Sequence, residues 1–266
     1  MKDKIKSLCK DIEKEYNIKI IFCVESGSRS WRMDSKDSDY DVRFVYTRPL
    51  DDYLQINLPK DVIMKHYDKQ GNPHSAEGCF IDVCGFDIFK FTRMLSSSNP
   101  TVIEWLQSDI IYCGDKPKVF VDFAKNNFNK VSLYHHYKSM CRQNYLKYLK
   151  FGNLVTYKKY LYAMRGLVNA KYVSVSGILP PISFVHTLNA SSSFISQNII
   201  FKLKEIIELK KESREKKVIQ NEVKIDNYIE SFLKDNSDCP EYKSKATLTD
   251  LNKELRRLVK WLLKKM

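Results

Sequence analysis

The sequence predicts an α+β protein with two lobes: an N-terminal lobe with a small mixed β-sheet flanked by helices, and a C-terminal lobe that is all helical. Two apolar runs, 18–24 and 42–46, have the length and composition of buried strands. From Leu133 onward, apolar and aromatic residues recur at helical spacing instead. The charge also divides. Residues 1–128 hold 19 Lys/Arg and 20 Asp/Glu, a net of −1, whereas residues 129–266 hold 26 and 12, a net of +14. We therefore predict one domain over 1–128 and a second, basic domain over 129–266.

The N-terminal lobe begins with an amphipathic helix over residues 3–16, whose apolar side chains would cover the sheet. Asn17 is the expected stop of this helix. The elements predicted next are a core strand over 20–24, a short helix over 28–33 and a second strand over 39–46.

Beyond the second strand, which ends at Arg48-Pro49 because proline lacks a backbone N–H, short elements alternate. The apolar run 79–83 predicts a further strand, interrupted by Asp82. The other predicted elements are a short helix over 51–56, a strand over 61–67, a loop over 69–77, and helices over 88–95, 101–106 and 117–127.

The C-terminal lobe reads as consecutive helices. The first helix carries a tyrosine-rich stripe from Tyr134 to Leu149, which we interpret as helix-packing core, with an RNA-stacking platform as the alternative. A linker over 234–246 precedes the last helix, which begins at the capping box-like Thr247-x-x-Asp250. The helices between them are predicted over 157–172, 183–188, 194–211 and 223–233.

The stretch from Glu25 to Phe44 carries the chemistry. It contains Gly27, Ser28 and Arg29 in a turn that follows the first strand. Glycine lets a backbone approach a phosphate closely, because it has no side chain. The serine hydroxyl and the backbone N–H groups that follow it can bind phosphate oxygens. The planar, positively charged guanidinium of the arginine can donate two parallel hydrogen bonds to the same phosphate.

Asp39 and Asp41 lie two residues apart on the second predicted strand and therefore point to one face, together with Arg43. Two neighbouring carboxylates repel each other unless a cation lies between them, and Mg²⁺ held by carboxylates and substrate phosphates is the usual solution. Two such ions, about 3.5–4 Å apart, clamp the attacking and leaving oxygens of a phosphoryl displacement. The alternative is a merely polar strand end.

A Gly-Ser pair followed after ten residues by Asp-x-Asp resembles the DNA polymerase β-type nucleotidyltransferase superfamily. The segments ESGSRSW, DSDYDVRFVY, GFDIFKFTRML, SNPTVIEWL and YHHYKSMCRQNYLKYL together resemble its RlaP-type family, named for a proposed association with RNA repair. The resemblance covers roughly residues 20–235. One position departs from it: the family usually has glycine after the tryptophan, where this chain has Arg32.

The resemblance implies a metal-dependent nucleotidyltransferase. The triphosphate of an NTP would lie on Gly27, Ser28 and Arg29, with Ser30 and Arg43 also contributing. Mg²⁺ or Mn²⁺ would be held by Asp39 and Asp41, and by a third carboxylate on a strand. Asp82, between two apolar residues, fits that third role and would orient or deprotonate the attacking hydroxyl. Asp87 is its rival, although a helix N-cap explains it more simply.

The acceptor is expected to be RNA, such as a transfer RNA end, because a strongly basic half beside a phosphoryl-transfer site suits a polyanion. A lysine-rich compositional bias is the alternative explanation of the charge. Candidate substrate contacts are His135, Lys158, Lys159 and Arg165, which can equally be structural or solvated side chains. The alternative functions are transfer to a protein or small-molecule hydroxyl, or a catalytically silent RNA- or nucleotide-binding module.

The composition, 43% apolar and 12% aromatic, is that of a globular protein. No stretch approaches the ~20 apolar residues that span a bilayer, and the charged N-terminus has no apolar signal core. We therefore expect a cytoplasmic protein without a membrane partner. The seven cysteines are scattered, with Cys79 and Cys84 as the closest pair, and we expect free, mostly buried thiols rather than a zinc site.

Overall fold

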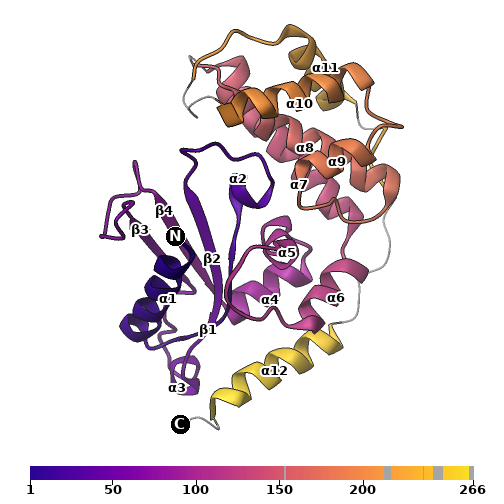
Figure 1. The fold of residues 1–266 in the computed structure, drawn as a ribbon. Coiled ribbons are helices and arrows are strands. Elements are labelled where there is room, and N and C mark those ends of the chain that lie inside the picture. The colour runs from indigo at the N-terminus through magenta and orange to yellow at the C-terminus, as the bar shows by residue number, and fades with distance from the viewer. Residues whose placement is uncertain (153, 213–216, 236, 242–247, 264–266) are drawn as a thin grey trace. The chain divides into compact units, whose positions relative to one another are not determined.

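The computed structural model of the chain describes residues 1–152, 154–212, 217–235, 237–241 and 248–263, which form the predicted α+β fold (Figure 1). The chain divides into two compact units. The first unit contains Met1–Ser30, Asp39–Phe128 and the C-terminal helix α12 (Thr249–Leu263). The second contains Trp31–Ser38 and the described part of Asn129–Lys245.

The first unit is built on a five-stranded mixed sheet with the strand order β3-β4-β2-β1-β5. Strands β2 and β4 pair in parallel, and the other neighbouring strands pair antiparallel. Because β2 and β4 are parallel, their first residues lie side by side at the same end of the sheet (Figure 1). The strands are β1 (Lys19–Glu25), β2 (Tyr40–Thr47), β3 (Val62–Tyr67), β4 (Ile81–Asp87) and β5 (Ile111–Gly114).

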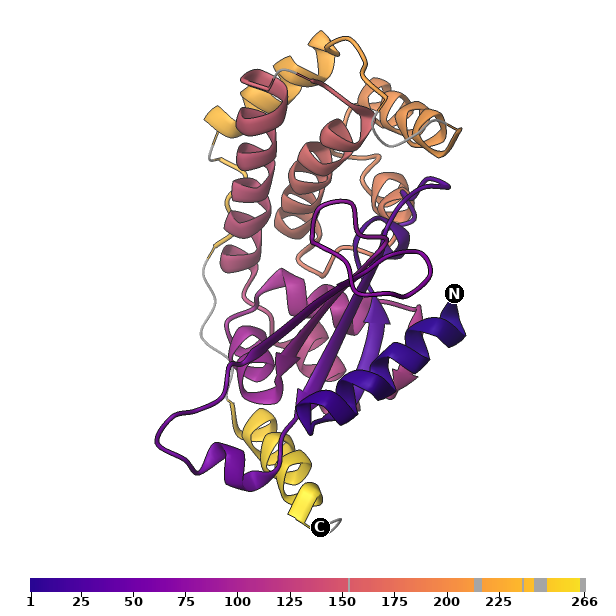
Figure 2. The same ribbon diagram turned by 90° about the vertical axis from the view of Figure 1, so that its left-hand side faces the viewer.

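Helix α1 (Lys2–Tyr16) lies across one face of this sheet (Figure 2). Its apolar stripe, which includes Ile5 and Ile12, is buried in one cluster with Val42 and Phe44 of β2. Asn17 ends the helix in the left-handed conformation, with φ of 49°, as expected for its C-cap. The regular spacing of the apolar residues in α1 puts them on one side of the helix, and their packing shields this face of the sheet from solvent.

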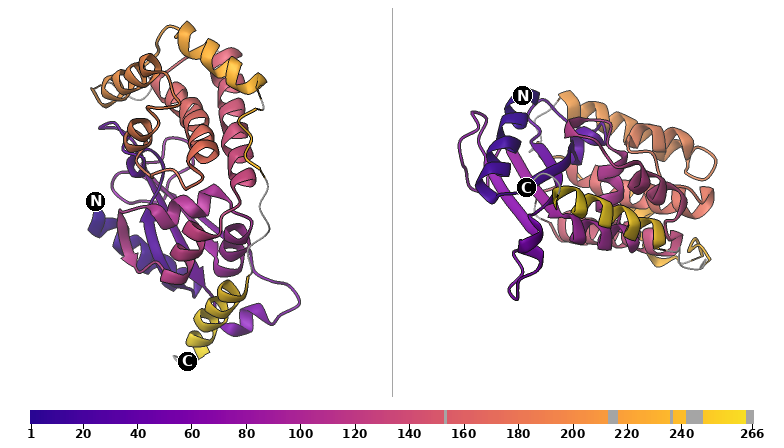
Figure 3. Two further views of the ribbon diagram at one scale, coloured as in Figure 1. Left: turned by 90° about the vertical axis from the view of Figure 1, so that its right-hand side faces the viewer. Right: turned by 90° about the horizontal axis from the view of Figure 1, so that it is seen from below.

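The opposite face of the sheet carries α4 (Ile88–Ser96), α5 (Pro100–Gln107) and α6 (Lys118–Asn126). The ring of Phe22 on β1 meets the ring of Phe91 on α4, with centroids 5.7 Å apart. Helix α12 contacts α4, α6 and the short α3 (Leu50–Tyr53), so the end of the chain completes this unit (Figure 3).

The second unit is helical. Its main contact joins α7 (Lys130–Asn144) to α8 (Tyr157–Ser176), where Gly166 lies so close that an added Cβ would be 2.7 Å from the Cys141 nitrogen. Tyr134, Tyr137 and Tyr145 of the predicted stripe are buried in this packing. The remaining elements are the π-helix η1 (Tyr145–Lys150), α9 (Phe184–Ala190), α10 (Gln197–Glu212) and α11 (Val223–Lys234).

The segment Trp31–Ser38 packs with these helices although its neighbours in the chain belong to the first unit. The Trp31 carbonyl accepts a hydrogen bond of 3.0 Å from the Phe184 N–H. The buried Lys210 ammonium donates to the Met33 carbonyl. The compact units thus share the boundary after residue 128 with the predicted domains, but they group α12 and this segment differently. From the resemblance and the charge we predict that 1–128 is the catalytic nucleotidyltransferase domain and 129–266 the basic substrate-binding domain, and these roles stay predictions.

Some local predictions were wrong. Strand β5 was not predicted, because its four residues carry too short a pattern. Helix α2 (Gly27–Ser30) is shorter than the predicted 28–33, since the chain turns at Trp31 and Arg32. The predicted helix start at Thr247 and the linker residues 242–246 lie outside the described residues. Among the described helices, none combines the length and apolar character needed to cross a bilayer.

Candidate functional site

Two predicted carboxylates meet at the beginnings of the parallel strands. Asp41 of β2 and Asp82 of β4 are direct register partners. Both side chains are about a quarter exposed, at 27% each. They lie on the face of the sheet opposite to Val42 and Phe44, which pack under α1. The alternation predicted for this strand is therefore confirmed.

Arg43 forms ion pairs with both acids. Its Nη2 is 2.8 Å from Asp41 Oδ1 and 2.7 Å from Asp82 Oδ2. Its Nη1 donates a hydrogen bond of 2.8 Å to the Asp82 carbonyl. The guanidinium neutralises both carboxylates. Its Nη2 contacts both acids, as a cation bridging them would do. The sequence assigned Arg43 to the nucleotide, and the structure adds this pairing with the two acids.

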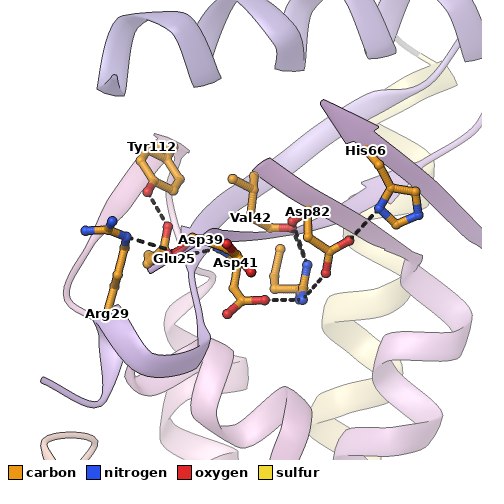
Figure 4. Close-up of polar contacts among 9 residues, drawn as sticks. Glu25, Arg29, Asp39, Asp41, Val42, His66, Asp82 and Tyr112 are labelled. Atoms are coloured by element: carbon orange, nitrogen blue, oxygen red, sulfur yellow. Dashed lines mark hydrogen bonds and ion pairs between the residues drawn. The ribbon is translucent and has the colours of Figure 1, made fainter. Parts of the chain in front are cut away.

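Asp39 lies just outside the strand, because β2 begins at Tyr40. It is exposed and enters the site beside Asp41 (Figure 4). Its carbonyl accepts a hydrogen bond of 3.0 Å from Arg29 Nε. The Arg29 guanidinium also stacks 3.9 Å from the centre of the Tyr40 ring. Arg29 is thereby fixed against the segment that carries Asp39.

The Gly-Ser corner touches Asp41 directly. Gly27 has a φ of +59°, and a Cβ added to it would lie 1.8 Å from Asp41 Oδ2. The Ser26 N–H donates a 2.8 Å hydrogen bond to the Asp41 carbonyl. Ser28 and Ser30 are buried, and the Ser30 hydroxyl lies 3.3 Å from the Ser108 hydroxyl. Because only glycine fits against the carboxylate, the corner and the acid are locked in one arrangement.

Glu25, which sequence reasoning did not assign to the site, supports Asp41 from behind. The Glu25 side chain is fully buried. Its Oε1 accepts a 2.8 Å hydrogen bond from the Asp41 N–H, and its Oε2 accepts one from the Tyr112 hydroxyl. Burial raises the pKa of Glu25 to about 7, although these two hydrogen bonds act in the opposite direction. The sequence feature that could have indicated this role is the position of Glu25, an acid that directly follows an apolar run and precedes Ser-Gly-Ser.

His66 is a second residue that sequence reasoning missed. It is the register partner of Asp82 across β3 and β4, and its Nδ1 lies 3.0 Å from Asp82 Oδ1. The two atoms are not aligned as a hydrogen bond, and among the described residues neither has another hydrogen-bond partner. A buried carboxylate oxygen without a hydrogen bond has a lone pair available for a ligand. No local pattern marked His66, because its partner lies on another strand.

Asp87, the rival third carboxylate, lies at the other end of β4. Its Oδ1 accepts a 2.9 Å hydrogen bond from the Phe89 N–H and so caps α4. Its Oδ2 accepts a 2.7 Å hydrogen bond from the Tyr53 hydroxyl. The expectation of a helix N-cap is confirmed, and of the two candidates only Asp82 pairs with Asp41 in the sheet.

The four candidate substrate contacts all belong to the second unit. Lys158 and Arg165 flank one aromatic pair: Lys158 lies 5.8 Å from the Tyr162 ring centre and Arg165 3.6 Å from that of Trp31. Arg165 is only 5% exposed. Their roles toward a substrate stay predictions. Lys159 donates to the Leu154 carbonyl, and His135 is exposed beside Cys239.

The donor set fits a hard divalent cation. Carboxylate oxygens are the ligands that Mg²⁺ and Mn²⁺ prefer. Asp41 and Asp82 are register partners and Asp39 is adjacent, but among the described residues the three carboxylates do not gather within 4.8 Å of one another. A cation here would take over the neutralising role that Arg43 has between the two acids.

Known proteins resemble the whole chain. A family model described as "RlaP: RNA repair pathway DNA polymerase beta family" matches residues 1–261. The uncharacterized protein YcgL of Bacillus subtilis (strain 168) is 30% identical over 264 residues, which cover 97% of this chain and 95% of that protein. A solved structure of a nucleotidyltransferase-like protein from Exiguobacterium sibiricum 255-15 is 12% identical and covers 98% of this chain and 91% of its own. The TM-score between the two structures is 0.30.

Proposed function

The chain belongs to the RlaP family, described as the RNA repair pathway DNA polymerase beta family, and from this membership we propose that it transfers a nucleoside monophosphate from an NTP to a hydroxyl group of RNA. The observation that carries the proposal is the pairing of Asp41 with Asp82 beside a glycine that nothing larger can replace. A cation-binding pair of acids next to a phosphate-accepting backbone corner is suited to phosphoryl transfer.

In this proposal the triphosphate lies against the backbone N–H groups of the Gly27 corner. The missing side chain of Gly27 leaves the space that the Asp41 carboxylate occupies. Ser28, Ser30 and Arg29 supply donors. Arg43, which pairs with both acids here, would be free to contact the phosphates if a cation took its place between Asp41 and Asp82. Mg²⁺ or Mn²⁺ on Asp39, Asp41 and Asp82 would neutralise charge at the α-phosphate and on the leaving pyrophosphate.

The acceptor hydroxyl is positioned by Asp82, whose carboxylate lies beside His66. Asp82 orients this hydroxyl and removes its proton as the bond to phosphorus forms. Glu25 keeps the Asp41 backbone in place through its 2.8 Å hydrogen bond, so the acids are held before the substrate arrives. Most of the rate enhancement then comes from positioning and electrostatics.

RNA is the proposed acceptor because the family description names an RNA repair pathway and residues 129–266 have a net charge of +14. A transfer RNA end is one such acceptor. Transfer to a protein or small-molecule hydroxyl is the second candidate, and a catalytically silent RNA- or nucleotide-binding module is the third. The retention of all three acids disfavours a silent module.

Incubating the purified protein with labelled NTPs, total RNA and either Mg²⁺ or Mn²⁺ tests the proposal. We expect label to move to RNA, and we expect Asp41→Asn and Asp82→Asn each to lower the rate by at least about 100-fold while retaining the fold. Asp87→Asn is the matched control, because this acid caps α4 and should leave the rate within about threefold. Transfer by Asp41→Asn at the wild-type rate would exclude the assigned site.

The salt dependence of binding separates the acceptor classes. If RNA is bound through the basic residues, its affinity should fall steeply between about 50 and 200 mM salt, because counterions are released from the phosphates. Fluorescence anisotropy with a labelled RNA measures this. Label transferred to protein or a small molecule, together with an RNA affinity that salt does not change, would favour the second candidate.

A further inference from the structure

Three of the seven cysteines, which the sequence indicated were scattered, meet inside the first unit. Cys9 comes from α1, Cys23 from β1 and Cys113 from β5. Their sulfur atoms all lie within 4.8 Å of one another, which among the described residues is the one such group of histidine, cysteine or acidic side chains. Cys23 and Cys113 are direct cross-strand partners, and Cys9 reaches them from the helix above.

The sulfur spacing suits a shared metal ion. Cys9 Sγ and Cys23 Sγ are 3.7 Å apart. Two thiolates on one tetrahedral Zn²⁺, with Zn–S bonds of about 2.3 Å, are about 3.8 Å apart. A disulfide would instead require the sulfurs to close to about 2.05 Å. The Cys9–Cys23 pair therefore has the spacing of two ligands on one ion, and the Cys113 sulfur lies within 4.8 Å of both.

The surroundings suit an anionic metal–thiolate centre. Cys9 and Cys23 are buried, while Cys113 is half-buried, and Cys9 and Cys113 line a pocket of about 520 Å³. This pocket has room for a water molecule as a fourth ligand. Its lining has a net charge of +2, from Lys6, Lys10, Lys19, Arg257, Glu13 and Asp115.

We propose that Cys9, Cys23 and Cys113 bind one thiophilic d¹⁰ cation, Zn²⁺ or Cu⁺, in a structural site separate from the carboxylates. Thiolates select these soft ions over Mg²⁺ and Mn²⁺. When the ion binds, the three sulfurs become thiolates and the thiol protons that remain on them are released to solvent. The ion joins α1 to the sheet at β1 and β5, close to the strand end that carries Glu25.

The test uses the full-length protein, reduced and freed of metal by a chelator. Co²⁺ is the optical probe, because cobalt bound to thiolate gives an intense near-ultraviolet charge-transfer band that cobalt bound only to carboxylates lacks. We expect one Co²⁺ per chain with this band, displacement by one equivalent of Zn²⁺, and a Tm higher by several degrees with metal bound. A parallel titration with Cu⁺ against a competing chelator decides which ion binds more tightly.

Cys113→Ser should weaken binding by at least about tenfold, because it removes one of three ligands. Cys84→Ser is the matched control: Cys84 is half-buried on β4 and lies outside the cluster. Wild-type protein that gives no thiolate band with Co²⁺ and binds no Cu⁺ overturns the proposal. So does Cys113→Ser that binds as tightly as wild type. If Cys113→Ser fails to fold by circular dichroism, the wild-type spectrum and metal stoichiometry decide alone.

Discussion

Arg32 holds a left-handed backbone conformation, with a φ of 60°. This conformation costs a residue with a side chain about 1–2 kcal/mol, whereas glycine adopts it freely. The resemblance to the RlaP family leads us to expect glycine at this position, and glycine would adopt this φ without strain. The adjoining Trp31 side chain is held in the helical unit by Arg165 and by Tyr162.

We therefore expect Arg32→Gly to stabilise the protein by about 0.5 kcal/mol. The relief of backbone strain is partly offset by the greater entropy that glycine has in the unfolded chain. Urea unfolding measures the difference. Lys36→Gly is the control: Lys36 is exposed in the same segment but has no positive φ, so its replacement should destabilise. A loss of stability in Arg32→Gly would mean that the arginine side chain contributes more than its backbone costs.

Asp87 provides a prediction about pH. Burial raises the pKa of Asp87 above its usual value of 3.8. Between the usual and the raised value the folded state binds more protons than the unfolded state, so the contribution of Asp87 to stability falls as pH rises. We expect the free energy of unfolding of Asp87→Asn to decline less than that of wild type from about pH 4 upward. Parallel urea titrations across this range, showing equal slopes for both proteins, would contradict this expectation.

At the scale of the element, the parallel pairing of β2 with β4 determines which acids meet. The register sets Asp41 opposite Asp82, and it sets Arg43 within reach of both. A shift of either strand by one residue would turn the acids to the opposite face. The apolar residues that alternate with them, such as Val42 and Val83, oppose this shift because they are buried under α1.

Removing the charge of Arg43 should expose the repulsion between the acids. We expect Arg43→Met to lose about 2 kcal/mol of stability without divalent ions, because two partly buried carboxylates lose their shared partner. Added Mg²⁺ should recover more stability in this variant than in wild type, as thermal unfolding can measure. The control is Lys65→Met, which removes an exposed pair with Glu15 and should change little. An equal Mg²⁺ effect in all three proteins would argue against a cation between Asp41 and Asp82.

The sequence predicted those parts of the site that lie in one continuous segment. Gly27, Asp39 and Asp41 are close in the chain, and strong apolar runs define the strands on both sides of them. Glu25, His66 and Tyr112 were missed, because their partners come from strands whose pairing no local pattern reveals. The cysteine cluster was missed for the same reason, since its members come from α1, β1 and β5. Strand β5, which supplies Tyr112 and Cys113, was itself too short to predict.

At the scale of the whole molecule, the units do not follow the order of the chain. The first unit needs α12, although more than a hundred residues separate this helix from α6. Leu251 and Val259 of α12 are buried, while its outer side, including Lys253, is exposed. Burying two such side chains stabilises by roughly 3–6 kcal/mol, which is a large fraction of the stability of an ordinary domain.

We therefore expect Leu251→Ala to destabilise the first unit by about 2–4 kcal/mol. Lys253→Ala, on the same helix but exposed, should change stability by less than about 0.5 kcal/mol. A fragment of residues 1–128 should be less stable than the full chain, because it lacks α12. Hydrogen exchange of the amides of β1 and β2 reports on this unit specifically. Equal protection in Leu251→Ala and wild type would show that α12 is dispensable for the sheet.

The late position of α12 has a consequence for biosynthesis. A ribosome releases the chain from its N-terminus, so the strands that carry the acids emerge long before the helix that covers α4 and α6. The nascent sheet must therefore wait, with apolar surface uncovered, while the entire helical unit is translated. Chaperones that recognise such surface can bind during this interval, and the first unit is completed only after α12 has been translated.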